Sequence, residues 1–207
     1  MGNVLLNGAA VEIEKQPHSL LELVAEVEQK HLTKEWIIVE VKADDDKIES
    51  FTYPDGSLLA YDPEKTVCIT ARKSSDILVD ILVRFEGYLG RMMPGIQQIV
   101  ALFRSGDSEE ANKHYRDVIE GIRVLIELIQ NIRQTGMVGD EPLSPDGKGL
   151  GDLANDLKGT LEELVRAQGE GAGEQIADAL EFELIKQLYN WQESLPELRR
   201  IVESQHG

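Results

Sequence analysis

The spacing of apolar residues changes once along the chain, near residue 75. Before that point, apolar residues alternate with polar ones or cluster in short β-branched runs, a pattern typical of strands. After it, they recur every three or four residues, which is the period of an α-helix with one buried face. The pattern therefore predicts an α+β protein with a β-rich domain over 1–74 and a helical domain over 75–207.

The N-terminal stretch begins with a predicted hairpin and a predicted helix. Asn7-Gly8 is a turn dipeptide because both residues tolerate positive φ, so a hairpin is expected over 4–15. Ser19 is a suitable N-cap residue, and Glu22 three residues later completes a capping box. The helix that follows is expected to end near His31.

Further β-rich runs follow this helix and predict strands over 36–41, 48–53 and 66–71. The resulting order of elements resembles a ubiquitin-like β-grasp, in which one helix covers one face of a mixed sheet. The runs Val4–Gly8 and Ser19–Leu23 are similar to the small sulfur-carrier branch of that fold. Such carriers use a free C-terminal Gly-Gly, whereas the last predicted strand runs into a helix near Ser75. The domain is therefore expected to be a docking surface or a lid.

The helical half predicts an antiparallel four-helix bundle, because several amphipathic helices must bury their apolar stripes against one another. Pro94 is expected to kink or interrupt the first helix, and Ser108 is expected to cap the second. A Gly/Pro-rich loop is predicted over 134–149, and Pro196 is expected to end the last long helix before a short tail helix.

The helical half resembles the flagellin export chaperones, which are small four-helix bundles. The segments that carry the resemblance are 103–112, 118–122, 153–157 and 195–198. The resemblance implies a protein that holds an amphipathic segment of a secreted or assembling partner in a helical groove, and that is flagellum-associated in a bacterial cell. Such a groove binds a helix through anchors at i, i+3 and i+7.

Five side chains are candidates for contact with such a partner. Methionines adapt their shape to a bound surface, and two of them adjoin Pro94-Gly95, where a bend is expected. Aromatic side chains near the end of the last long helix are further candidates, and the alternative for all of them is packing in the helical core. The candidates are Met92, Met93, Ile96, Tyr189 and Trp191.

Charge limits the classes of partner. The chain has 38 Asp and Glu residues against 21 Lys and Arg, a net charge of −17, and such a surface repels phosphate backbones and anionic lipids. Nucleic acid and membrane are therefore not expected as partners, and a protein segment is. The N-terminus lacks the pattern of a signal peptide, and no apolar run approaches the length of a membrane helix, so a cytoplasmic location is expected.

No pattern in the chain predicts catalysis, a cofactor or a metal ion. Cys68 lies in an apolar run without a neighbouring base, Asp44–Asp46 lacks the spacing of a calcium loop, and Gly147–Gly151 lacks both nucleotide-binding fingerprints. The expected function is a non-enzymatic, protein-binding adaptor or chaperone-like protein. The alternatives are a structural homo-oligomer that associates through its helical face, for example as a homodimer, and an enzyme that uses scattered carboxylates.

Overall fold

A computed structural model describes residues 3–139, 141–144 and 146–204 of the chain. It divides into two compact units, Met1–Ile77 and Leu78–Gly207. The first unit is a small mixed sheet with one helix, and the second is helical throughout its regular structure. The predicted α+β class is confirmed.

The sheet of the N-terminal unit has five strands in the order β2-β1-β5-β3-β4. Its outer pairs are antiparallel, as is β3 with β5, whereas β1 and β5 run parallel at the centre. A register shift between Ile38 and Glu40 marks a bulge in β3. The strands are β1 Val4–Leu6, β2 Ala9–Ala10, β3 Trp36–Ala43, β4 Asp46–Lys47 and β5 Val67–Lys73.

The turn between β1 and β2 is the predicted Asn7-Gly8 turn. Both residues have positive φ, 49° for Asn7 and 83° for Gly8, as a two-residue hairpin turn of this kind requires. The Asn7 side chain also spans to the next strand, because its amide nitrogen donates to the Ala71 carbonyl at 3.0 Å and its oxygen accepts from the Ala71 N–H at 2.9 Å. The turn therefore fixes the end of β1 against β5.

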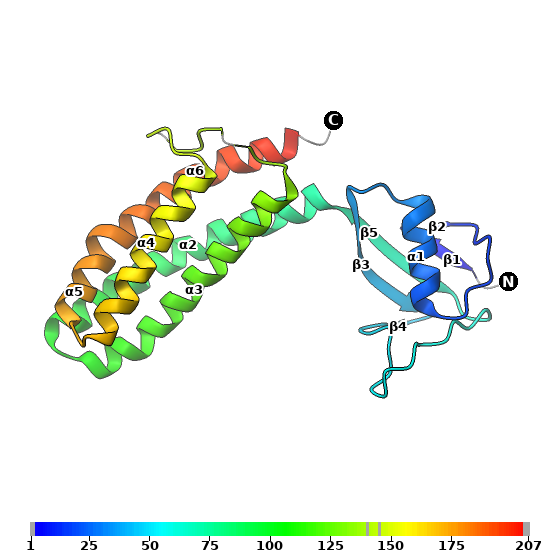
Figure 1. Ribbon diagram of the computed structural model, residues 1–207, viewed down its shortest axis with the longest axis horizontal. Coiled ribbons are helices and arrows are strands. Elements are labelled where there is room, and N and C mark those ends of the chain that lie inside the picture. The colour runs from blue at the N-terminus through cyan, green and yellow to red at the C-terminus, as the bar shows by residue number, and fades with distance from the viewer. Residues whose placement is uncertain (1–2, 140, 145, 205–207) are drawn as a thin grey trace. The chain divides into compact units, whose positions relative to one another are not determined.

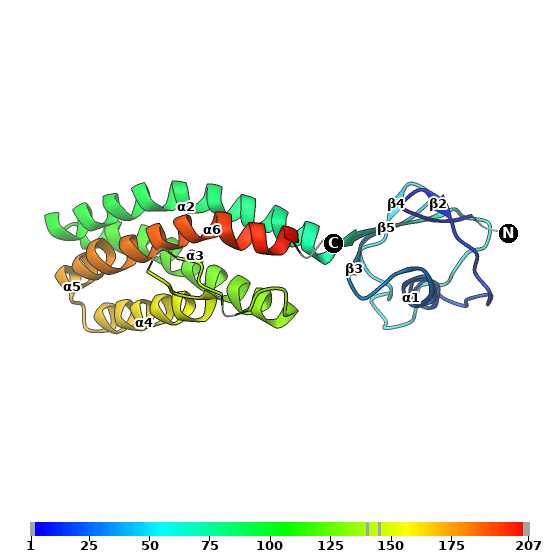
Figure 2. The ribbon, with the colours of Figure 1, turned by 90° about the horizontal axis from the view of Figure 1, so that it is seen from above.

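Helix α1, Leu20–His31, lies along one face of this sheet (Figures 1 and 2). The predicted Ser19 cap is confirmed, because the Ser19 hydroxyl accepts from the Glu22 N–H at 3.2 Å. The capping box differs from expectation: the Glu22 carboxylate accepts from the His18 N–H at 2.8 Å, one residue before the cap, rather than from the Ser19 N–H. The apolar face of the helix closes a compact core between helix and sheet. That core contains Val4, Leu20, Leu23, Val24, Val27, Val41, Val67 and Ile69.

The strand predicted over 48–53 is wrong. The strand β4 comes earlier, at Asp46–Lys47, directly after a two-residue turn at Asp44 and Asp45. Residues 51–59 instead form a small loop closed on itself, in which the Leu59 N–H donates to the Phe51 carbonyl at 2.8 Å and Thr52 bridges to Leu58. Local turn hydrogen bonds at Pro54–Gly56 thus replace a continued ladder with β3.

In the helical unit, three long helices and one composite helical stretch run lengthwise beside one another (Figures 1 and 2). They share one hydrophobic core, to which each contributes a stripe of buried residues at helical spacing. The composite stretch combines α5, a π-helical segment η1 and α6. The bounds are α2 Ser74–Ser105, α3 Ser108–Thr135, α4 Leu150–Gly169, α5 Gly173–Asp178, η1 Ala179–Leu184 and α6 Ile185–Ser204.

The predicted break at Pro196 does not occur, and of the two outcomes expected at Pro94, a kink or an interruption, the interruption does not occur. Helix α2 continues through Pro94, and α6 continues through Pro196 to Ser204. Both prolines lie at exposed positions of their helices. Near Pro196, the side chains of Leu195, Leu198 and Val202 are buried. A proline inside a helix costs about 3 kcal/mol, and the burial of apolar side chains on both sides offsets that cost here.

Two other helix signals differ from expectation. The second helix is capped by Asp107 rather than Ser108, because the Asp107 carboxylate accepts from the Glu110 N–H. The π-helical turn η1 was not predicted, since its residues keep the apolar spacing of an ordinary helix.

The predicted Gly/Pro-rich connection corresponds to the segment between α3 and α4. Helix α3 ends at Thr135, and Gly136 then adopts a left-handed conformation with φ 68°. Val138 and Leu143 from this segment are buried in the helical core, and the Lys148 ammonium pairs with the Asp156 carboxylate of α4 at 2.7 Å. These contacts hold the connection against the helices.

Candidate docking groove between α2 and α3

The side chains proposed from the sequence do not gather on one exposed face. Met92, Met93, Ile96 and Trp191 are buried among the core residues of the helical unit, and Trp191 is 1% exposed. Tyr189 is 50% exposed and lies on α6. Met92 also reaches the wall of a surface hollow on α2. The partner-binding role of these five residues stays a prediction, and the surface that the helices offer lies beside them.

That surface is a groove between α2 and α3, made of two adjoining hollows. One has a volume of about 330 Å³ and the other about 540 Å³, and both are lined by Tyr88 and Asp117. The first hollow is further lined by Arg91, Met92, Gly95, Gln98, Ile99, Leu102, His114 and Val118. The second is further lined by Ile81, Arg84, Phe85, Glu120, Gly121, Val124 and Leu128.

The groove arises from residues that follow the helical period on both walls. On α2, the lining positions run from Ile81 to Leu102 at intervals of three or four residues, and on α3 they run from His114 to Leu128 in the same way. Residues at this spacing share one side of a helix. Each helix therefore carries a row of groove-lining residues next to the apolar stripe that it buries in the core.

Tyr88 divides the two hollows, and Gly121 makes room for it. A Cβ atom at position 121 would overlap the Tyr88 hydroxyl, so the ring lies directly against the α3 backbone at this glycine. Phe85 supports the ring from the preceding turn, with the two ring centroids 6.2 Å apart. A side chain larger than glycine at position 121 would displace Tyr88 and change the shape of both hollows.

Apolar side chains in the groove remain open to solvent. Val124 is 56% exposed, and Ile81 is also among the exposed large apolar residues. Tyr88 and Leu128 are half-buried and belong to the margin of the core. The second hollow thus has an apolar floor that is continuous with the core and exposed on its outer side, which is a common property of protein interaction surfaces.

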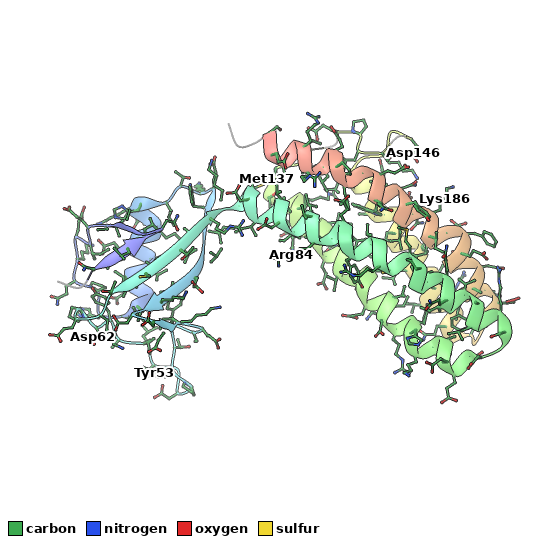
Figure 3. The ribbon with its side chains drawn as sticks, turned by 180° about the vertical axis from the view of Figure 1, so that it is seen from behind. Tyr53, Asp62, Arg84, Met137, Asp146 and Lys186 are labelled. Atoms are coloured by element: carbon green, nitrogen blue, oxygen red, sulfur yellow. The ribbon has the colours of Figure 1, made fainter. Side chains whose placement is uncertain are left out.

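The charged side chains of the groove are separated by sign. The α2 wall carries Arg84 and Arg91, which are seven residues apart, and the α3 wall carries Asp117 and Glu120. Glu120 has Arg123 3.7 Å away, whereas Arg84, Arg91 and Asp117 form no ion pair or hydrogen bond within the described residues. Arg84 is labelled on α2 in Figure 3. One wall is therefore basic and the other acidic, with unpaired charges on both.

His114 lies at the end of the groove nearest the turn between α2 and α3. Its Nε2 atom is 3.0 Å from a Glu110 carboxylate oxygen one helical turn away. The histidine thus already has a carboxylate neighbour on its own helix.

The described residues contain no group of three or more His, Cys, Asp or Glu side chains placed to hold a metal ion. The buried polar atoms that lack a hydrogen-bond partner within the described residues include Gln187 Oε1 and two atoms of aromatic side chains, the Tyr115 hydroxyl and the Trp191 Nε1 atom. Burial raises the pKa of Tyr115 to about 12, so its phenol keeps its proton at neutral pH. Neither Tyr115 nor Trp191 nor Gln187 lines the groove.

The candidates predicted from the sequence came from the main apolar stripes and a helix end, and four of the five lie in the core. The groove residues Arg84, Asp117 and Gly121 flank these stripes, whereas Tyr88 belongs to the stripe of α2 and also lines the groove. The sequence did contain a signal for the groove. Ile81 and Val124 widen the apolar faces of their helices beyond the part that packs in the core, and both side chains are exposed. Which flank of each helix meets its neighbour could not be read from spacing alone.

Comparison with known proteins places this groove within a family. Residues 80–194 match the family described as a domain of unknown function, DUF8042, and the match covers more than half of the chain. The chain belongs to the DUF8042 family. The DUF8042 region contains every residue that lines the groove and leaves out the sheet of the N-terminal unit.

No curated protein and no solved structure matches the chain. Within the part of the chain that the structure describes, no helix combines the length and apolarity that crossing a membrane requires.

Proposed function

We propose that the chain is a non-enzymatic, protein-binding module whose α2–α3 groove holds an amphipathic helical segment of a partner. The observation that carries this proposal is the pair of adjoining, partly apolar hollows between two long helices, with Val124 exposed at one of them. Removing such apolar surface from water stabilises a complex by about 25 cal/mol per Å² before the costs of association.

The shape of the groove favours a helix as its occupant. From Ile81 to Leu102, α2 rises by roughly 31 Å, the length of a helix of about 21 residues. The channel between two neighbouring helices accepts the side-chain ridge of a third helix. Anchors at i, i+3 and i+7 of the partner would enter the two hollows on either side of Tyr88.

The proposal includes a finer description of the fold of each unit. The strand order β2-β1-β5-β3-β4 with α1 on one face supports a ubiquitin-like β-grasp, and the lengthwise helices support an antiparallel four-helix bundle. The resemblance of the helical half to flagellin export chaperones favours a secreted or flagellar protein as the partner. A partner of that kind would be held before export, which places the complex in the cytoplasm.

A second copy of the chain is the alternative occupant, as in a structural homo-oligomer. Two copies would bring net charges of −17 together, and like charges oppose association. The groove itself is compatible with a foreign helix of lower negative charge, so we favour a heterologous partner.

Site-specific photo-crosslinking in the cells that produce the protein tests the proposal. A photoreactive phenylalanine analogue at position 124 samples the groove, and the same analogue at position 165 is the control, because Val165 is 44% exposed on α4 outside the groove. We expect position 124, and not position 165, to crosslink to one protein through a segment with helical apolar spacing.

A synthetic peptide with the sequence of that segment should then bind the full chain and lose affinity for Val124→Asp but not for Val165→Asp. Equal crosslinking from both positions would contradict the proposal. Crosslinking of position 124 to a second copy of the chain would replace it with the homo-oligomer.

A further inference from the structure

We infer that the partner helix carries acidic residues along one flank and basic residues along the other, with the acidic flank facing α2 and the basic flank facing α3. This inference rests on the proposed function, because it describes the helix that the groove would hold. It adds the chemistry of the partner and the rotation of the helix about its own axis.

The basic wall defines the first half of this requirement. Arg84 and Arg91 stand seven residues apart on α2, about 10 Å along the helix axis. They line different hollows on either side of Tyr88. A helix lying alongside α2 meets both guanidinium groups with carboxylates that are also about seven residues apart, and Arg–carboxylate pairs can form two hydrogen bonds each.

The acidic wall defines the second half. Asp117 and Glu120 are three residues apart on α3, and Asp117 lines both hollows. Asp117 has no ion-pair or hydrogen-bond partner within the described residues, so a Lys or Arg from the partner would be a new neighbour rather than a competitor. A carboxylate in that position would instead face two carboxylates of the wall.

The arrangement of charge also determines the direction of the bound helix. Turning an amphipathic helix end for end, with its apolar face still in the groove, exchanges its left and right flanks. A helix with two differently charged flanks therefore matches the walls in one direction and opposes them in the other. A helix with two identical flanks has no such preference.

The net charge of the protein and the charges of the groove walls favour different peptides, so the two effects can be separated by experiment. At −17, general electrostatic attraction favours the most basic peptide. The separated walls favour instead a peptide with no net charge, because two lysine-bearing flanks would place one of them against Arg84 and Arg91.

The test uses four designed 21-residue peptides that share one apolar stripe at helical spacing and differ only in their flanks. One has glutamates on one flank and lysines on the other (the two-sign peptide), and the others have lysine, glutamate or glutamine on both flanks. Binding to the full chain is measured by fluorescence anisotropy at 0.15 M salt, where charges separated by more than about 8 Å are largely screened. We expect the two-sign peptide to bind about tenfold more tightly than the glutamine peptide, and more tightly than the lysine peptide.

A charge-reversal variant locates the effect. Arg84→Glu/Arg91→Glu should weaken binding of the two-sign peptide about tenfold and make the lysine peptide the tightest binder. Lys158→Glu/Lys186→Glu changes the net charge equally at exposed positions of α4 and α6 outside the groove (Figure 3 labels Lys186). This control should leave the order of the four peptides unchanged.

The outcomes separate the inference from the proposed function. If the glutamine peptide binds wild-type protein but not Val124→Asp, the groove binds helices. If the lysine peptide then binds wild-type protein at least as tightly as the two-sign peptide, the inference is wrong and the proposed function stands. If the glutamine peptide does not bind, or binds Val124→Asp equally well, both fail.

Discussion

Two seams between helices of the helical unit differ in how closely the backbones approach: we call one the closed seam and the other the open seam. In the closed seam, formed by α4 with α5, η1 and α6, the backbones approach closely over much of their length. Small residues permit this approach, among them Thr160, Ala167 and Ala177, all buried. The Gln187 amide nitrogen donates to the Thr160 hydroxyl across the seam at 2.7 Å.

In the open seam, formed by α2 and α3, large side chains separate the helices. Phe85 and Tyr88 of α2 project between them, and Tyr88 extends to the α3 backbone at Gly121. Side chains of this size fill the inner half of the seam and leave the two hollows on its outer half. The comparison indicates that the closed seam contributes mainly to stability, whereas the outer half of the open seam is available for binding.

The largest effect is expected for truncation of a side chain in the closed seam. Leu180 of η1 is fully buried, and Leu180→Ala should lower the free energy of unfolding by about 2–5 kcal/mol, because it leaves a cavity. Val124→Asp in the open seam should change it by less than about 0.5 kcal/mol. Urea denaturation of both variants measures the difference, and equal losses would show that the two seams do not differ in this way.

The next effect concerns the inner half of the open seam and depends on pH. Tyr115 of α3 packs edge-on against Phe103 of α2, and burial raises its pKa from 10.0 to about 12. The folded state therefore holds the phenol proton more tightly than the unfolded state does. The stability that this provides is complete below pH 10 and is lost as the pH rises through about 12, by on the order of 2 kcal/mol.

Tyr115→Phe removes both the titration and a buried hydroxyl without a partner. The free energy of unfolding of this variant at pH 7 should equal or exceed that of the wild type. Between pH 10 and 12, the free energy of unfolding should decrease less in the variant than in the wild type. Chemical denaturation at several pH values checks this. An identical decline in both proteins would mean that Tyr115 is not buried in the neutral form.

A smaller effect is expected from the hydrogen bond across the closed seam. Thr160→Val keeps the shape of the side chain but leaves the Gln187 amide without its partner, which should cost about 1–2 kcal/mol. Adding Gln187→Leu should recover part of that loss, because no polar group then remains unpaired. If the double variant loses as much stability as the two single variants lose in total, the two side chains do not interact directly.

The smallest effect on stability is expected at the glycine of the open seam. Gly121→Ala gains up to about 1 kcal/mol of helix propensity, but its Cβ displaces the Tyr88 ring, so the net change in stability should stay below about 1 kcal/mol. Binding of the glutamine peptide should nevertheless weaken several-fold, because both hollows change shape. Gly159→Ala, in open space on α4, is the matched control and should leave binding unchanged.

Much of the fold could be predicted because it follows from local rules. The Asn7-Gly8 turn and the Ser19 cap depend on residues adjacent in sequence, and the helical stripes have a clear period. Continuity through Pro94 and Pro196 could not be predicted, since it depends on burial on both sides of each proline. The π-helical turn η1 likewise leaves no pattern in the residue types.

The groove was less accessible to sequence reasoning than the core. Residues such as Ile96 and Trp191 fit the main apolar stripe, and they lie in the core. The groove combines Tyr88 from one helix with Gly121 from another, and their relation appears only when the two helices are placed side by side.

Hydrogen–deuterium exchange of the full chain with and without the glutamine peptide shows whether the α2–α3 groove binds a helix, because it reports which backbone segments the peptide covers or stabilises. We expect added protection over 81–102 of α2 and 114–128 of α3, absent in Val124→Asp, with little change in α4 and α6. Protection confined to α4 and α6, or no protection at saturating peptide, would contradict it.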